Sequence, residues 1–562
     1  MNSKLLLGGE VMINVGGDDL SKIKYPANMK LSEISKDFIS NYKTYIVAAK
    51  VDYVLKDLQD VAGEYKKIDF VELASPEGIK IYQRSVVFLL ITAVGELYPK
   101  AKITVEHSLS NGLYCEIYKD NGINETDVRL IEQRMREIIT ENRPIIKKVL
   151  PKEGVVEFFK HTGHSEKAVL LEALPRPNLS IYNCGGVYDY LHGPMYSATR
   201  ELGLFALDYS APGVILRTPE AGKPDVVPPF VEQPKLASIF AEAEDWAHIL
   251  ECNYVANLNM QRKTGKIAEV IRVSEALHEK KVAEIADFIA RHIQKVRLIL
   301  IAGPSSSGKT TFAQRLRIQL IVNGIKPISI SLDNYFKDRL LTPRDENGNY
   351  DFEALEALDI DLFNDHLLKL MQGEIVELPY YNFITGKREM RGKLIKIADH
   401  QPIIIEGIHG LNEKLTKHIP RSVKYKIYIS ALTQLAIDGH NRIPTTDTRL
   451  IRRIVRDYNS RGSNALQTIR QWPSVRAGEV KNIFPYQEDA DSMFNSALIY
   501  ELGILKKYAE PLLRGVSHDV PEYDEALRLL NFLAYFMEIN AEDEVPINSI
   551  LREFIGQSCF EK

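Results

Sequence analysis

The sequence lacks the cysteine patterns of disulfide-linked and zinc-binding proteins. Only four cysteines occur in 562 residues, and they are widely scattered without a C-x-x-C pair. Long hydrophobic runs are also missing, since no apolar stretch reaches the ~18 residues of a membrane span. The chain does not open with a basic segment and an apolar core of the kind that directs secretion. We therefore expect a reduced, cytoplasmic protein with no membrane partner.

Strong charge of one sign is absent as well. Lys and Arg total 71 against 75 Asp and Glu, which gives a formal net charge of -4. This balance argues against wholesale nucleic-acid binding and leaves only a local basic patch open. The apolar share of 45% and the charged share of 26% are those of ordinary globular proteins. A length of 562 residues predicts roughly three or four domains.

The most informative stretch is RLILIAGPSSSGKTT, residues 297–311. It is a G-x-x-x-x-G-K-[ST] phosphate-binding loop in the required context, with an apolar strand before it and a helical pattern after it. We expect its backbone N–H groups to hold the phosphates of ATP, Lys309 to reach the β- and γ-phosphates, and the Thr310 hydroxyl to ligate Mg²⁺. The predicted cofactor-binding residues are Gly303, Pro304, Ser305, Ser306, Ser307, Gly308, Lys309, Thr310 and Thr311.

Two acidic residues follow apolar strands of the same region. The strand ISISLD ends at Asp333, and the buried run PIIIEG reaches Glu406. Open α/β sheets keep their reacting groups at the carboxyl ends of parallel strands, beside the phosphate loop. A strand-end cap is the alternative for each acid. Two such acids in one loop-bearing region favour a pair of carboxylates that face Mg²⁺ and ATP.

An arginine-rich segment, RLIRRIVRDYNSRG, lies further along the chain. Spacings of three and four place most of its arginines near one helical face. A solvated basic helix is one interpretation. Phosphoryl transfer, however, spreads negative charge that cations on a closing segment stabilise. The arginines concerned are Arg449, Arg452, Arg453, Arg456 and Arg461.

These motifs together resemble the uridine kinase family, with phosphoribulokinase as a more distant relative. Between about residues 298 and 515, IAGPSSSGKTTFA, SLDNYFKD, YDFEALEALD, LPYYNF, IIIEGI and RRIVRDYNSRG occur in the family's order and spacing. The resemblance implies an ATP- and Mg²⁺-dependent nucleoside kinase that phosphorylates a 5′-hydroxyl. It also implies a P-loop parallel sheet with helices on both faces.

The resemblance implies a role for each matching residue. Asp333 would orient the acceptor hydroxyl or accept its proton, while Arg456 and Arg461 would close over the phosphates. The implied catalytic residues are Asp333, Lys309, Arg456 and Arg461. The implied acceptor-binding residues are Glu353, Tyr381, Phe383 and Arg453. The implied metal ligands are Thr310, Glu406 and Asp333. This interpretation requires that Asp333 face the loop and that the protein's own side chains leave the loop free.

The acceptor-reading residues depart from the family pattern. Gly386 and Ser463 replace the histidine and the arginine that read the pyrimidine edge. A site that loses such donors loses orders of magnitude of selectivity. The acceptor is therefore open: another nucleoside, such as a purine that fills the space left by Gly386, a polyol, or a sugar phosphate.

The front of the chain resembles threonyl-tRNA synthetase. YIVAAKVDYVLKDLQDV, FVELASPEGIKIYQRSVVFLLITAVGELYPKAK, NGLYCEIY and VYDYLHGPMYSATR are similar to its ubiquitin-like TGS domain and its editing domain, over roughly the first 220 residues. The editing positions hold Arg84, Phe88, Leu191 and Met195, which cannot repeat the family's chemistry. We expect editing to be lost and the domain to persist as an altered pocket or as scaffold. Arg84 could hold an anion or lie on a solvated face.

Three leftover histidines, His161, His164 and His192, make only a weak metal pattern. The expected helices cover 31–42, 79–97, 237–257, 266–294, 310–323, 522–539 and 547–555. The sequence thus predicts an α/β protein in five segments: a TGS-like β-grasp domain (1–74), an α+β editing-like domain (75–265), a helical linker (266–295), a P-loop uridine kinase-like domain (296–515) and a C-terminal helical tail (516–562). The rival interpretation is a regulatory ATPase that senses tRNA or an amino acid. A tRNA partner is not expected, and self-association is left open.

Overall fold

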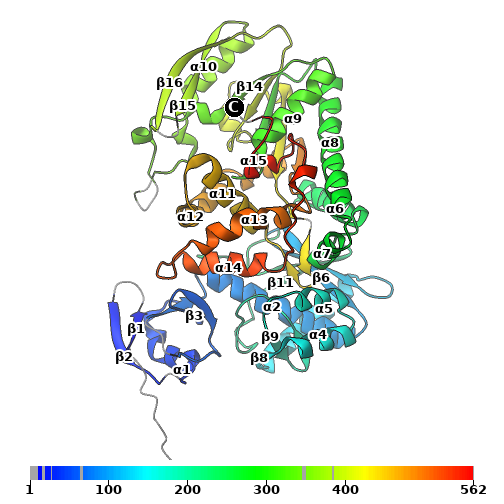
Figure 1. Ribbon diagram of the computed structural model, residues 1–562, viewed down its shortest axis with the longest axis vertical. Coiled ribbons are helices and arrows are strands. Elements are labelled where there is room, and N and C mark those ends of the chain that lie inside the picture. Colours follow the sequence, from blue (N-terminus) through cyan, green and yellow to red (C-terminus); the bar gives the residue numbers. More distant parts are fainter. Residues whose placement is uncertain are drawn as a thin grey trace, which may run out of the picture.

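The first part of the chain folds as a mixed five-stranded sheet with a short helical cover (Figure 1). The computed structural model describes residues 10–15, 19–26, 28–63, 67–344, 348, 350–382, 385–433 and 435–560. The strands are β1 (Glu10–Val15), β2 (Asp19–Lys24), β3 (Ile46–Val51), β4 (Val54–Asp57) and β5 (Lys67–Glu72), in the order β2-β1-β5-β3-β4. The helix predicted over 31–42 is wrong in type, because a single turn, α1 (Leu31–Ile34), continues as a 3-10 segment, Ser35–Asn41. Its apolar side chains still pack against this sheet.

The second region is built around one apolar helix, α2 (Pro76–Leu97), which starts where the Ser75 side chain accepts the Gly78 N–H group. This helix is long and apolar enough to cross a bilayer, yet 72% of its most apolar window is buried inside the fold, so it is a core helix. Two sheets accompany it. One contains β6 (Lys102–Leu109), β7 (Gly112–Tyr118), β11 (Ala206–Ser210) and β12 (Gly213–Arg217), and the other β8 (Ile145–Pro151), β9 (Asn178–Cys184) and β10 (Val187–Asp189).

The helices of this region and of the connection that follows it differ in part from the prediction. The single helix expected over 237–257 is wrong, because it is broken between residues 249 and 255, where Glu251 takes a left-handed φ of 52°. The segment 266–294 instead forms one long helix. The helices are α3 (Glu125–Thr140), α4 (Lys152–His161), α5 (Ser165–Glu172), α6 (Pro234–Ile249), α7 (Val255–Lys263) and α8 (Ile267–Arg291).

The C-terminal half is organised by a parallel five-stranded sheet in the order β14-β17-β13-β18-β21. The strands are β13 (Leu298–Ala302), β14 (Ile328–Ser331), β17 (Ile403–Glu406), β18 (Lys424–Ser430) and β21 (Ser492–Asn495). Central strand β13 is buried on both faces, since Ile299 and Ile301 belong to a different core from Leu298 and Leu300. Helices therefore cover both faces, which confirms the predicted α/β class.

The first of these two cores includes side chains from α8 and from α9 (Lys309–Val322), and the second includes side chains from α10 (Ile360–Met371). A two-stranded ribbon, β15 (Val376–Asn382) and β16 (Lys387–Ile395), lies beside α10. Four further helices pack below the sheet. They are α11 (Thr445–Arg461), α12 (Ala465–Asn482), α13 (Glu501–Arg514) and α14 (Tyr523–Leu533).

A small hairpin of the kinase-like half reaches into the front half. It consists of β19 (Ala436–Asp438) and β20 (Asn441–Arg442), and its turn accepts the Val105 N–H group on the Gly439 oxygen at 2.8 Å. Lys167, which is 1% exposed, forms ion pairs with Asp189 beside it and with Asp438 of the hairpin at 3.4 Å. This junction is therefore buried and charged.

The tail returns to the kinase-like sheet. The helix expected over 522–539 is shorter, ending at Leu533, and the helix expected over 547–555 is reduced to α15 (Arg552–Ile555). Helix α14 packs on α13 and on strand β4, while α15 contacts α11 and lies near the start of α9 (Figure 1). The tail thus covers part of the phosphate loop that the sequence identifies.

Candidate active site

The phosphate-binding loop has a backbone that only its own residue types allow. A Cβ atom at Gly303 would lie 1.9 Å from the Ile429 oxygen, and Gly308 has a φ of +80° at the start of α9. The hydroxyls of Ser306 and Ser307 are buried without a hydrogen-bond partner in the described part of the chain. The amides of residues 308–310 also have no hydrogen-bond acceptor among the described residues. These unused donors fit the phosphate oxygens of ATP.

Two carboxylates accept hydrogen bonds from other donors of the loop. The Ser305 N–H group donates to Glu479 at 3.1 Å, and the Thr311 N–H and hydroxyl donate to Glu553 of the tail at 3.3 and 2.7 Å. Free N–H groups at a helix N-terminus attract negative groups, which explains both contacts. The expectation that the protein's own side chains leave the loop free is therefore wrong for the Ser305 and Thr311 donors.

Lys309 is half-buried and lies among the acidic residues of the site. Its Nζ atom donates to the Pro304 oxygen at 3.1 Å. Burial lowers the pKa of Lys309, and the nearby carboxylates oppose that shift. These carboxylates are Glu406, Asp333, Glu553 and Glu353. Three of the four are acids that the sequence assigns to the site, so the fold brings them to one cation from separate segments.

The two carboxylates among the three candidate metal ligands are close enough to influence each other. Burial raises the pKa of Glu406 to about 7, and the neighbouring Asp333 charge adds to that rise. Ser331 donates its hydroxyl to Glu406 at 2.6 Å. The strand predicted to end at Asp333 is wrong by two residues: β14 ends at Ser331, and Asp333 lies in the 3-10 turn Leu332–Tyr335. This turn leaves Asp333 in the acidic group around Lys309.

These ligands fit Mg²⁺ only together with phosphate oxygens. The described residues contain no group of three or more His, Cys, Asp or Glu side chains that could hold a metal ion. Mg²⁺ commonly takes one or two carboxylates and completes its shell with substrate phosphates and water. Oxygen donors from Thr310, Asp333 and Glu406 satisfy that pattern. The weak HTGH pattern does not, because His161 contacts Glu157 on its own helix.

Glu353 lies on the acceptor side, close to α12. Burial raises the pKa of Glu353, and the charges of Arg453 and Lys309 oppose that rise. Its Oε2 atom is buried without a partner among the described residues. A Cβ atom at Gly478 of α12 would lie 2.2 Å from the Glu353 Cβ atom, so the helix approaches this closely only because residue 478 is glycine. The arrangement leaves one carboxylate oxygen able to accept a hydroxyl group.

The predicted arginine face of α11 is present, but it contacts the phosphate-binding loop and does not face solvent. Arg449 and Arg452 are 1% and 0% exposed. Arg449 donates to the Ser305 oxygen at 2.9 Å and pairs with Glu479, while Arg452 pairs with Glu501 at 2.6 Å. The solvated-helix interpretation is therefore wrong for these two residues, which fix the loop's conformation.

The remaining arginines of α11 lie nearer to the loop opening. Arg453 donates to the Ser305 hydroxyl at 2.7 Å. Arg456 and Arg461 both pair with Asp457, at 2.8 and 3.7 Å, and the side chain of Arg461 is 48% exposed. Their predicted action on the phosphates stays a prediction.

The acceptor end contains one residue that the sequence did not reveal. A Cβ atom at Gly386 would lie 2.8 Å from the Nε atom of Arg339, so a guanidinium group lies in the space beside Gly386. A purine acceptor at this position stays a prediction. Buried Tyr381 lies 5.5 Å from Phe336 between ring centres. Phe383 lies outside the described residues.

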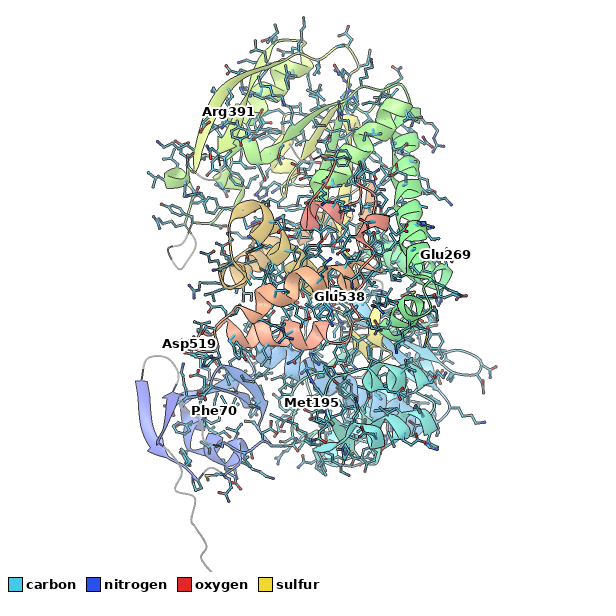
Figure 2. All side chains as sticks on the ribbon, viewed as in Figure 1. Phe70, Met195, Glu269, Arg391, Asp519 and Glu538 are labelled. Atoms are coloured by element: carbon cyan, nitrogen blue, oxygen red, sulfur yellow. The ribbon has the colours of Figure 1, made fainter. Side chains whose placement is uncertain are left out.

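Sequence reasoning missed Glu479, Glu553 and Arg339 because their contacts are made across long distances along the chain. Glu553 and Thr311 are 242 positions apart. In the front half, Phe88, Leu191 and Met195 are buried in an apolar core, which agrees with the loss of editing chemistry. Met195 is labelled in Figure 2.

Comparisons with known proteins match both halves of the chain. Residues 298–499 match the family model described as Phosphoribulokinase / Uridine kinase family. The threonine--tRNA ligase of Francisella tularensis subsp. novicida (strain U112) is 30% identical over 196 residues, which are 35% of this chain and 31% of the ligase. The ligase of Francisella tularensis subsp. tularensis (strain FSC 198) matches to the same extent. The match thus spans about a third of these ligases.

Among solved structures, a protein described provisionally as a fructose transport system kinase from Silicibacter sp. TM1040 is 17% identical with a TM-score of 0.28, covering 38% of this chain and 98% of its own. A possible uridine kinase from Bacillus stearothermophilus is 18% identical with a TM-score of 0.26, covering 38% of this chain and 100% of its own. Both predicted resemblances are confirmed: the C-terminal region of the chain matches the phosphoribulokinase and uridine kinase family, and its N-terminal region matches threonine--tRNA ligases.

Proposed function

We propose that this protein is an ATP-dependent kinase that transfers the γ-phosphoryl group to a primary hydroxyl, most simply the 5′-hydroxyl of a nucleoside. One observation supports this above all: Asp333, Glu353 and Glu406 converge on Lys309 beside the phosphate loop. A site of this kind provides a cation for the phosphates, carboxylates for Mg²⁺ and an acid that can accept an acceptor hydroxyl.

Each residue then has a physical task. ATP and Mg²⁺ supply the transferable phosphoryl group and neutralise its charge. Asp333 orients the acceptor hydroxyl and accepts its proton, since a carboxylate within hydrogen-bond reach of a hydroxyl can act as a general base. Glu353 accepts hydrogen bonds from acceptor hydroxyls, and Lys309 offsets the negative charge of the transferred group. Arg456 and Arg461 close over the phosphates after release from Asp457.

A sugar-phosphate kinase is the second candidate. Arg339 lies at the acceptor end, and its charge acts on the buried Tyr381 hydroxyl. A guanidinium group there could bind an acceptor's own phosphate in bidentate fashion. The regulatory ATPase and the cytoplasmic location also stay predictions. No part of this proposal depends on the oligomeric state.

The test is a screen of the full-length chain for ADP formation from ATP with nucleosides, polyols, sugar phosphates or tRNA. We expect one class of small hydroxyl compound to stimulate turnover, and mass spectrometry to find one phosphoryl group added to it. A nucleoside 5′-monophosphate as product supports the first candidate, and a bisphosphate supports the second. Stimulation by tRNA alone, with no phosphorylated small product, would overturn the kinase proposal in favour of the regulatory ATPase.

Substituting Gly478→Ala is expected to weaken acceptor binding selectively. The added methyl group would meet Glu353 at 2.2 Å and displace its carboxylate, although alanine normally favours a helix over glycine by about 1 kcal/mol. We expect KM for the acceptor to rise about tenfold or more, the effect of losing a charged hydrogen bond, while KM for ATP changes by less than about twofold. Steady-state kinetics measures both. Gly154→Ala in α4, where a Cβ atom meets nothing within 4 Å, is the control. An equal rise in both KM values would contradict the assigned position of Glu353.

A further inference from the structure

A second cavity, separate from the phosphate loop, lies where the front half, the kinase-like half and the tail meet. Its volume is about 510 Å³, within the usual range of small-molecule sites. Its walls come from the β3–β4 turn, α2, the loop 191–194, the β19–β20 hairpin, the start of α11 and α14. The proposed kinase chemistry does not use this cavity, whose walls combine segments of both halves and include two of the former editing positions, Arg84 and Leu191.

The acidic side chains of the cavity wall are all neutralised within the wall. Lys50 pairs with Glu77 at 2.9 Å and with Asp524 at 3.6 Å. Arg528 pairs with Asp447 at 2.6 Å and with Glu525 at 2.7 Å. These four carboxylates are the only acids among the described residues that line the cavity. Two cations therefore satisfy every anion of the wall.

Three further cations of the same wall make no close ion pair with a carboxylate. Arg84 donates from Nη1 to the Pro194 oxygen at 2.6 Å. The side chains of Arg442 and Lys80 make no hydrogen bond or close ion pair within the described part of the chain, although the charge of Asp447 acts on both. Burial lowers the pKa of Arg84 to about 10 and also lowers the pKa of Arg442. Both guanidinium groups are half-buried and keep N–H donors available for an anion that enters the cavity.

The start of α11 adds to this positive character. Residues 444, 446 and 447 line the cavity, and α11 begins at Thr445 without a side-chain cap. A 17-residue helix carries a partial positive charge at this end. Apolar side chains cover the rest of the wall, among them Val87, Leu191 and Phe532. The cavity thus combines unpaired cations with an apolar lining.

We infer that this cavity binds a small anionic metabolite, whose carboxylate or phosphate group is recognised by Arg84 and Arg442 and whose apolar part lies against Leu191. Arg84 occupies one of the former editing positions. In a pocket that has lost the editing chemistry, this residue would instead recognise an anion. The solvated-face interpretation of Arg84 is wrong, since its guanidinium group packs over Gly193 inside the cavity.

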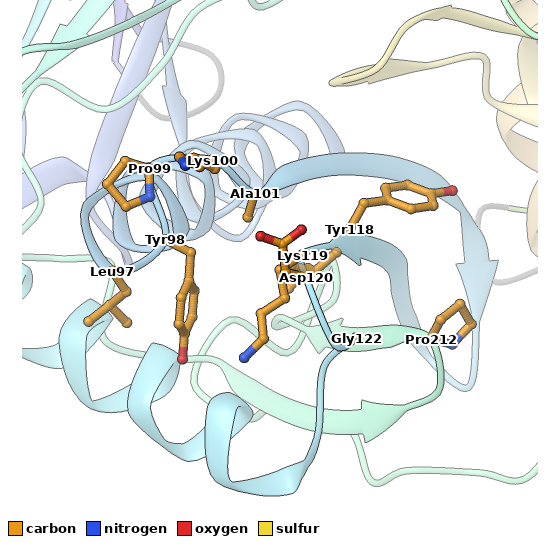
Figure 3. A pocket seen from close by; sticks show the side chains of 11 residues that line it. Leu97, Tyr98, Pro99, Lys100, Ala101, Tyr118, Lys119, Asp120, Gly122 and Pro212 are labelled. Atoms are coloured by element: carbon orange, nitrogen blue, oxygen red, sulfur yellow. The ribbon is translucent and has the colours of Figure 1, made fainter.

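A larger hollow at the end of α2 does not share these features. It measures about 760 Å³ and is lined by Tyr98 and Lys119 among others (Figure 3). Lys119 is already paired with Asp127 at 2.6 Å and lies over the Tyr98 ring at 4.6 Å. The charge of the Lys119 ammonium group is therefore already compensated within the protein, so this hollow does not offer an unpaired cation to an anion.

Calorimetric titration of the full-length protein tests this inference. The probes are inorganic phosphate, nucleoside monophosphates and single amino acids. They distinguish a cavity that binds a phosphate group from one that binds a carboxylate group. We expect one probe class to bind, and Arg84→Gln and Arg442→Gln each to weaken that binding about tenfold or more. Lys309→Ala should leave it unchanged, and so should Arg129→Gln on the exposed face of α3. Thermal melting of each variant checks that the fold is retained.

Two results would overturn the inference. One is that no probe binds at millimolar concentration. The other is that binding survives Arg84→Gln and Arg442→Gln but is lost in Lys309→Ala, which would assign the anion to the phosphate loop. Because the readout is binding and not turnover, its failure is distinguishable from failure of the proposed kinase activity.

The contacts between the C-terminal segment and the phosphate-binding loop support a second proposal, which rests on the proposed function. Besides the Glu553 contacts to Thr311, Ile550 lies 2.5 Å from the position of a Cβ atom at Gly308. Asn459 of α11 donates to the Phe554 oxygen at 3.0 Å, and Arg452 lies over the Phe554 ring at 4.9 Å. The segment 549–556 is thus held against the loop from two helices. We propose that it is an autoinhibitory contact that nucleotide must displace.

The test measures ADP affinity by calorimetry in the full chain, so that no acceptor is required. Glu553→Gln should lower the dissociation constant of ADP about threefold to tenfold, because the charged contact to Thr311 is lost. Glu538→Gln, an exposed acid of the tail, serves as control (Figure 2). Equal affinity in the wild type and in Glu553→Gln would overturn the autoinhibitory role. Absence of ADP binding in both would instead count against the proposed function.

Discussion

Replacing Asp333 by asparagine is expected to lower the rate of phosphoryl transfer about 10²–10⁴-fold, the range for loss of a general base, while ATP binding stays nearly unchanged. The amide keeps the shape of the side chain but cannot accept the acceptor's proton. It also removes a charge that raises the pKa of Glu406. Glu406 is therefore more fully ionised near neutral pH in this variant, which favours retention of Mg²⁺ and ATP.

Single-turnover kinetics with saturating ATP measures the chemical step, and calorimetry measures ATP affinity. Asp399→Asn, at an exposed position of the same half, provides the control substitution. Full activity in the Asp333 variant would remove its role as the base. Parallel loss of ATP binding and of turnover would instead assign Asp333 to nucleotide and metal binding.

Replacing Lys309 by alanine is expected to abolish measurable turnover, a loss of at least about 10²–10³-fold for one electrostatic contact to the transferred group. ATP affinity should fall as well, because the Lys309 charge meets the phosphates before and during transfer. The structure adds a reason that the motif alone does not give: Lys309 is the cation on which four carboxylates converge. Without it these acids repel one another and the approaching phosphates.

Initial-rate assays and nucleotide titration measure these two losses. Lys326→Ala, which removes an exposed lysine just after α9, is the matched control. Because the acids around Lys309 lose their shared cation, we also expect a lower melting temperature in this variant, restored in part at low pH where carboxyl groups are protonated. Turnover above about a tenth of the wild-type rate would contradict the assigned role.

The parts of the site that follow from local sequence could be predicted, and those that depend on distant contacts could not. A strand, a glycine-containing turn and a helix are adjacent in the chain, so the loop of residues 303–308 and the start of α9 follow directly from the order of residues. Glu406 ends β17 as predicted for the same reason. Glu553 could not be found in this way, because its contact with Thr311 depends on where the whole tail folds.

Arginine burial shows the same limit. The spacing of Arg449 and Arg452 correctly indicated one helical face, but spacing does not reveal what covers that face. Only the assembled fold shows that Glu479 and Glu501 pair with them. Helix type was similarly underdetermined at 31–42, where a 3-10 segment and an α-helix bury nearly the same residues. The break near Glu251 was missed because apolar spacing continues across it.

The buried junction around Lys167 has a consequence for how such a protein can change over generations. Removing one partner of a buried ion pair typically costs about 3–5 kcal/mol, a large part of a domain's stability. Asp438 supplies a partner from the opposite half of the chain. A recombination event that replaced the C-terminal half by one without an acid at this position would leave the ammonium group with Asp189 alone. The two halves of such a chain are therefore expected to change together during evolution.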